Sequence, residues 1–74
     1  MIDKQKVKDL LMQQLKNNPY IPADYDTVDY ISGVLRNSSS EVEKVVAEVI
    51  RELIKDDIVE VKTIDTYVWK LKNK

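Results

Sequence analysis

Cysteine and histidine are both absent from the 74-residue sequence, and glycine occurs only once, as Gly33. Without these two residue types the chain lacks disulfides and the ligands of the common zinc sites. One glycine cannot build a glycine-rich loop that cradles phosphate. The serines at 38–40 have only carboxylates and lysines as candidate bases. We therefore expect no enzymatic activity, no cofactor and no metal.

Long apolar runs are missing as well. No stretch approaches the roughly 20 apolar residues that a membrane span needs. The opening segment, MIDKQKVKDLL, lacks the apolar region and the cleavage site of a secretory signal. We therefore expect a cytoplasmic protein that does not enter a membrane. The composition, 43% apolar and 34% charged, predicts one small folded domain over residues 1–74 rather than a disordered chain.

Charge is distributed unevenly around a net charge of −1. Residues 1–16 and 58–74 carry a positive excess, whereas residues 17–57 carry a negative excess. Affinity for a nucleic-acid backbone comes mainly from cations that neutralise phosphates, and this chain has few of them. The lysines near its two ends could form one basic surface, or they could only keep the domain soluble.

Two helices are predicted in the first half of the chain. The first covers about residues 4–17, with Asp3 as its N-cap and an apolar stripe on one face. The second is capped by Asp26 or Thr27 and runs for roughly ten residues. Its inward side chains would be Val28, Ile31, Val34 and Leu35. Gly33 lies inside it at a cost of about 1 kcal/mol, which close approach of a neighbouring helix would explain.

The three tyrosines at positions 20, 25 and 30 allow two interpretations. Aromatic residues are enriched at protein interfaces, so the cluster could be a docking patch. Alternatively, at least one ring closes the core beneath the prolines at 19 and 22. Tyr20-Ile21 could also pair briefly as a short edge strand.

The segment SSSEVEKVVAEVIRELIKDDIVEVK, at 38–62, carries the clearest pattern in the chain. Ser38 with Glu41, and Ser40 with Glu43, match the capping box at the start of a helix. Apolar residues then form a stripe over about four turns, before Asp56-Asp57 ends the helix with a left-handed residue. The stripe could pack within its own domain or form a seam with a second copy. Its members are Val42, Val45, Val46, Val49, Ile50, Leu53 and Ile54.

Two segments near the end alternate between apolar and polar residues, IVEVK at 58–62 and YVWKLK at 67–72. This period of two predicts an antiparallel hairpin. Its apolar face would carry Val59 and Val61 from the first strand, and Tyr67, Trp69 and Leu71 from the second.

The order of helix, link, helix, turn, helix and hairpin resembles the winged helix-turn-helix family over nearly the whole chain. The most specific likeness is ISGVLRNSSSEV, from Ile31 to Val42. Many members have an apolar, small, x, x, Leu, Gly, x, Ser, x, x, x, Val run at the junction of the second and third helices. IVEV at 58–61 likewise resembles the first strand of a wing. Arg36 stands where the family usually has glycine, followed by Asn37, which tolerates left-handed geometry.

The resemblance implies an α+β, mostly helical fold with three helices and a C-terminal two-stranded β-hairpin. It also implies binding to double-stranded DNA, with the third helix in the major groove and the hairpin against the backbone. Serine hydroxyls and lysine can contact phosphates or base edges, and glutamate can accept from a cytosine amino group. The residues so implied are Ser38, Ser39, Ser40, Glu43, Lys44, Ala47, Lys62 and Thr63.

The charge of the third helix supports a different interpretation. Its outer face could be a solvated surface of ion pairs between residues three or four apart: Glu41–Lys44, Lys44–Glu48, Glu48–Arg51 and Glu52–Lys55. The acidic face could then dock a basic partner, such as a polymerase or a replication factor. On this alternative the winged helix is a protein-interaction module.

We predict a small DNA-binding regulator of transcription from a microbe, a phage or a plasmid, with the interaction module as the alternative. A homodimer is expected, because small domains gain stability by pairing and many winged helices read two half-sites. The two functions differ in their salt dependence, since DNA affinity falls steeply with salt.

Overall fold

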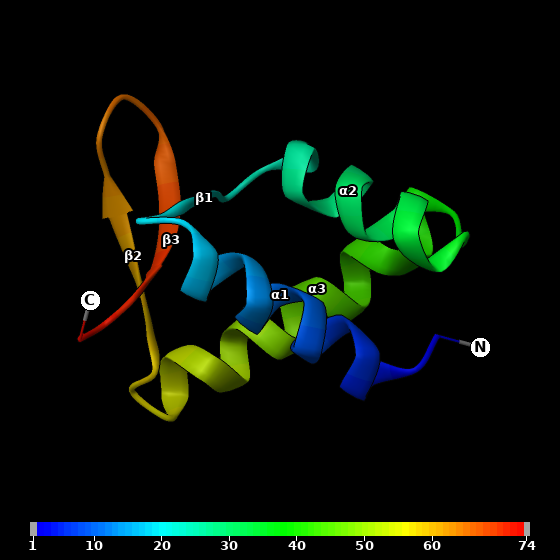
Figure 1. The fold of residues 1–74 in the computed structure, drawn as a ribbon, viewed down its shortest axis with the longest axis horizontal. Helices are drawn as coiled ribbons and strands as arrows, with labels where there is room; N and C mark the ends of the chain where they lie inside the picture. Colours follow the sequence, from blue (N-terminus) through cyan, green and yellow to red (C-terminus); the bar gives the residue numbers. More distant parts are fainter. Residues whose placement is uncertain (1, 74) are drawn as a thin grey trace.

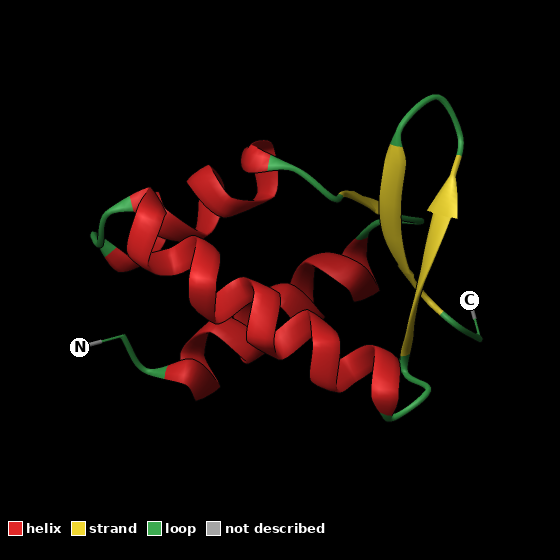
Figure 2. Cartoon of the chain, turned by 180° about the vertical axis from the view of Figure 1, so that it is seen from behind, coloured by secondary structure: helices red, strands yellow, loops and turns green. Residues whose placement is uncertain are grey.

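A computed structural model describes residues 2–73 of the chain (Figure 1). Within this range the chain forms α1 (Lys4–Asn17), α2 (Tyr25–Leu35) and α3 (Ser39–Lys55), followed by a hairpin of β2 (Val59–Thr63) and β3 (Tyr67–Leu71). A two-residue strand, β1 (Ile21–Pro22), lies between α1 and α2. Figure 2 shows the hairpin standing at one end of the helices. The fold is α+β and mostly helical, with a winged-helix-like topology.

The N-terminal cap of α1 is as predicted, but α2 begins earlier than predicted. Asp3 accepts a hydrogen bond from the Gln5 N–H at 2.9 Å. The N-cap of α2 is Asp24, so the predicted cap at Asp26 or Thr27 is wrong. Thr27 is instead buried in the first turn, where its hydroxyl donates to the Pro22 carbonyl at 2.6 Å. This bond holds β1 against α2.

The turn between α2 and α3 places a left-handed residue where the family usually has glycine. Arg36 has φ 56° and ψ 39°, and the Asn37 N–H donates to the Ser32 carbonyl at 3.2 Å. The left-handed conformation therefore falls on Arg36 and not on Asn37. Ser38 caps α3 as predicted, whereas Ser40 lies inside the helix and forms no second cap. Asp57, with φ 66°, supplies the left-handed residue after α3.

The core is formed where the apolar stripes of the three helices meet the start of the hairpin. The α3 stripe packs within its own domain, because Val42, Val46, Val49 and Leu53 are at most 2% exposed. The alternative of a seam with a second copy through these residues is therefore wrong. The remaining buried members of the cluster are Val7, Leu11, Leu15, Ile21, Val28, Ile31, Ile50 and Val59.

Some apolar residues that were assigned to the interior lie at the surface. Val34 is 50% exposed and Ile54 is 41% exposed. Tyr20, Tyr25 and Tyr30 are between 43% and 59% exposed, so none of them closes the core. The packing interpretation of the tyrosines is therefore wrong, and the docking interpretation stays a prediction.

The sheet has the strand order β1-β3-β2, and both pairings are antiparallel. Val59 lies opposite Leu71 and Val61 opposite Trp69, so the predicted shared face is confirmed. The helices cover only the end of this face that lies nearest to them, because the tip of the hairpin projects clear of them (Figure 1). Val61 is 49% and Tyr67 66% exposed. Val68, on the opposite face and between Pro22 and Lys62 in the ladder, is 4% exposed.

Gly33 has no packing reason to be glycine, since a Cβ there would meet nothing within 4 Å. The expected close approach of a neighbouring helix is therefore wrong. Gly33→Ala should raise the free energy of unfolding by about 1 kcal/mol, which raises the melting temperature by roughly 4–8 °C. Thermal unfolding followed by circular dichroism tests this. Ala47→Gly, at an exposed position inside α3, is the matched control and should lower the melting temperature by a similar amount.

Candidate nucleic-acid interface

The side of α3 that faces away from the core carries a line of cations. Lys44, Arg51 and Lys55 recur at intervals of seven and four residues and are all exposed. We call these three residues the cationic ridge. Among residues 2–73, none of the three lies within ion-pair distance of a carboxylate. The four pairs that the sequence suggested along this helix are therefore not formed.

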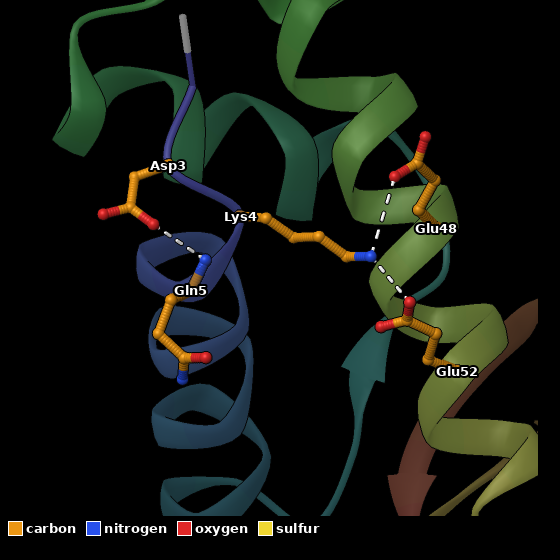
Figure 3. Close-up of polar contacts among 5 residues, drawn as sticks. All are labelled: Asp3, Lys4, Gln5, Glu48 and Glu52. Carbon is orange, nitrogen blue, oxygen red and sulfur yellow. Dashed lines mark hydrogen bonds and ion pairs between the residues drawn. The ribbon is translucent and has the colours of Figure 1, made fainter.

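Two of the glutamates next to the ridge, Glu48 and Glu52, are held by the first helix. The Lys4 Nζ at the start of α1 lies 2.6 Å from Oε1 of Glu52 and 3.8 Å from Oε2 of Glu48. Figure 3 shows the Lys4 side chain reaching across from α1 to both carboxylates on α3. Two of the negative charges of α3 are thus drawn to the α1 side of the helix.

The ionisation of this pair follows from its hydrogen bond. The bond to Glu52 raises the pKa of Lys4, and the bond from Lys4 lowers the pKa of the Glu52 carboxyl. Lys8 adds to the second effect through its charge. Lys4 and Glu52 are both exposed, and exposed ion pairs contribute little to stability. The effect of Lys4 is therefore on the charge that α3 presents to solvent.

The three serines at the start of α3 differ in what they can offer to a ligand. The Ser38 Oγ accepts from the Glu41 N–H at 3.4 Å and serves as the cap. The Ser39 hydroxyl donates to Asp29 at 2.8 Å, which ties α3 to α2. Ser40 is exposed, and its Oγ lies 3.4 Å from that of Ser38. Of the three, Ser40 is the best placed to reach a ligand along the ridge.

Glu43 and Ala47 lie on the flank of α3 that faces the hairpin, where they line a shallow groove. The Tyr25 hydroxyl, at the start of α2, donates to Glu43 at 3.3 Å. The groove has a volume of about 260 Å³. Ala23, Asp24, Val28, Val46 and Trp69 complete its lining. Its surface is mostly apolar, and its two charged residues are both acidic.

The structure does not bring the two predicted wing residues to one face. Thr63 lies opposite Tyr67 in the ladder, on the same face as Trp69, which is the face toward α3. Lys62 lies opposite Val68, so its side chain points to the other face of the hairpin. On the α3 side, the wing therefore presents Thr63 and Tyr67 rather than a cation.

Three of the lysines near the two ends of the chain are paired with carboxylates. Lys4 reaches α3, Lys70 pairs with Glu60 at 3.5 Å, and Lys72 pairs with Asp57. The Asp57 carboxylate accepts a hydrogen bond from Lys72 and raises its pKa. Arg51 and Lys55, by contrast, were named from the sequence only as members of ion pairs and not as DNA-binding residues. Their spacing from Lys44 was the signal that would have found them.

No group of three or more acidic side chains in residues 2–73 is arranged to hold a metal ion. Across the same range, no helix combines the length and apolarity required to cross a bilayer. A scan against protein-family models found no match, and neither the curated proteins nor the solved structures contain a match to this chain. The winged-helix-like class thus rests on the order and packing of the elements.

Proposed function

We propose that this protein binds double-stranded DNA and regulates transcription, with α3 in the major groove and the cationic ridge against phosphates. The observation that supports this is the placement of Glu48 and Glu52 against Lys4. Lys4 offsets one of their two charges on the α1 side, while Lys44, Arg51 and Lys55 remain exposed on the outer side.

The dimensions of the ridge suit this role. Lys44 and Lys55 are eleven residues apart in one helix, which is about 16 Å along its axis. The major groove of B-DNA is about 12 Å wide, so the ends of the ridge can reach phosphates on both sides of it. Ser40 adds a hydroxyl near the N-terminus of α3, where backbone N–H groups and the helix dipole favour phosphate.

A salt titration of duplex binding tests the proposal. Each phosphate contact contributes about −0.9 to the slope of log K against log salt concentration, so the three ridge cations predict a slope of about −3. Fluorescence anisotropy with a labelled random duplex, starting at ~50 mM salt, measures it. Binding that is absent at this salt concentration, or that does not weaken as salt is added, would contradict the proposal.

The groove favours a second candidate, a protein-interaction module. Its apolar lining and the acidic Asp24 and Glu43 suit a peptide with an apolar side chain next to lysine or arginine. At about 260 Å³, the groove is smaller than the roughly 300–1,000 Å³ of typical small-molecule sites. Trp69 is the only tryptophan, so its fluorescence would report a peptide in the groove. A fluorescence change without duplex binding would favour this function.

A further inference from the structure

The outer edge of the hairpin is an unpaired strand. β3 lies between β1 and β2, so β2 has a strand on one side only. Among residues 2–73, no backbone hydrogen bond joins the other side of β2 to another segment. Such an edge presents a row of donors and acceptors that another strand can complete.

The residues whose backbone groups face outward can be identified from the ladder. The Lys72 N–H donates to the Ile58 carbonyl at 2.9 Å, and the Ile64 N–H donates to the Thr66 carbonyl at 3.1 Å. Hydrogen-bonded and non-hydrogen-bonded pairs alternate in an antiparallel ladder, so Glu60 and Lys62 also direct their N–H and C=O groups toward β3. Val59, Val61 and Thr63 direct theirs to the open edge.

We propose that two copies of the chain pair their β2 strands antiparallel, with Val61 on the two-fold axis. In this register Val61 lies opposite the partner's Val61, and Val59 lies opposite the partner's Thr63. All three residues have outward-facing backbone groups, so every pair that must exchange hydrogen bonds can do so. The two three-stranded sheets become one continuous sheet with an isologous interface.

The side chains next to Val61 are complementary to themselves in this register. Glu60 lies opposite the partner's Lys62, and Lys62 lies opposite the partner's Glu60. These are non-hydrogen-bonded pairs, in which side chains on neighbouring strands come closest. Lys62 is exposed, and the Glu60 side chain is 38% exposed with Lys70 as its neighbour in the same chain. Each carboxylate would then lie between two cations.

The same charges disfavour other registers. A shift of two residues in one direction places Glu60 opposite the partner's Glu60, and a shift in the other direction places Lys62 opposite the partner's Lys62. Like charges directly opposite are destabilising. A shift of one residue brings outward-facing backbone groups against residues whose groups face β3. Among the registers within two residues, the one centred on Val61 alone satisfies both the backbone and the charges.

Pairing also covers apolar surface. The Val61 side chain is 49% exposed, and in this register it packs against the partner's Val61 on the face of the hairpin that Trp69 shares. The two-fold axis is normal to the sheet, so both copies present this face, and with it α3, on the same side. The dimer does not depend on DNA binding, but it would place two ridges on one side of the assembly.

Charge exchange between two variants tests the interface. Lys62→Glu leaves two carboxylates next to Val61, and Glu60→Lys leaves two ammonium groups, so each variant repels its own copy. When the two are mixed, both cross-strand pairs regain opposite charges. Sedimentation equilibrium over a range of concentrations and native mass spectrometry of the mixture measure the result. Lys55→Glu, on the cationic ridge, is the matched control and should dimerise like the unchanged protein.

The expected outcome is a dimer of the unchanged chain, self-association roughly tenfold weaker or more in each variant, and a mixed dimer when the two are combined. A chain that stays monomeric up to about 1 mM would overturn the proposal. Unchanged dimerisation of Lys62→Glu would overturn the interface, and failure of the mixture to pair would overturn the register. Circular dichroism of each variant checks that the fold is retained, because Glu60 also pairs with Lys70 in its own chain.

Discussion

Leu53→Ala will lower the free energy of unfolding by about 2–5 kcal/mol, the range found when a buried leucine is truncated to alanine. Leu53 is 1% exposed and belongs to the cluster that joins all three helices to the hairpin. Its carbonyl also accepts the Ile58 N–H at 2.9 Å, where the chain leaves α3 for β2. Collapse around the missing atoms would therefore have to move both α3 and the hairpin.

This loss is large for so small a domain. Proteins have roughly 0.05–0.15 kcal/mol of stability per residue, which for this chain is about 4–11 kcal/mol in total. Urea unfolding followed by circular dichroism gives the change. The neighbouring Ile54 is 41% exposed, and Ile54→Ala is the control, with an expected loss below about 1 kcal/mol. Equal losses at the two positions would show that the assigned face of α3 is wrong.

Elements with a clear local period could be predicted from the sequence. The stripe of α3 and the alternation of the hairpin each fix which residues face inward, and Asp3 and Ser38 cap the helices to which the sequence assigned them. The start of α2 could not be fixed in the same way. Asp24 and Asp26 are both good caps, and the choice depends on Thr27 bonding the Pro22 carbonyl, which is a contact between elements.

The candidate site was only partly accessible from the sequence. Lys44 and Ser40 were identified by resemblance to a recognition helix, and both lie on the exposed side of α3. The role of Lys4 could not be identified from the sequence, because Lys4 lies 44 and 48 residues before its partners Glu48 and Glu52. Net charge along α3 therefore suggested an acidic surface. Only the packing of α1 beside α3 shows which of those charges remain unpaired.

Charge reversal at Lys44 and Arg51 together will abolish duplex binding. Each phosphate contact contributes about tenfold to affinity at ~50 mM salt, as follows from a slope of about −0.9 per contact. Loss of two contacts therefore weakens binding at least about 100-fold, and the introduced carboxylates add repulsion. Fluorescence anisotropy against one labelled duplex measures the change.

Lys44→Glu alone should reduce the salt slope of duplex binding by about one. Lys6→Glu, on the exposed side of α1, carries the same charge change and should leave the slope unaltered.

Substitution of Lys4 distinguishes duplex binding through α3 from a general effect of the protein's charge on DNA affinity. Lys4→Met releases Glu48 and Glu52 next to the ridge, so it should weaken duplex binding although Lys4 itself lies on another helix. Lys6→Met removes the same charge from the same helix without releasing a carboxylate, since no ion pair involves Lys6 among residues 2–73. A larger loss for Lys4→Met than for Lys6→Met is expected because the freed carboxylates repel the phosphates that the ridge contacts. Equal losses would show that α3 does not lie against the duplex.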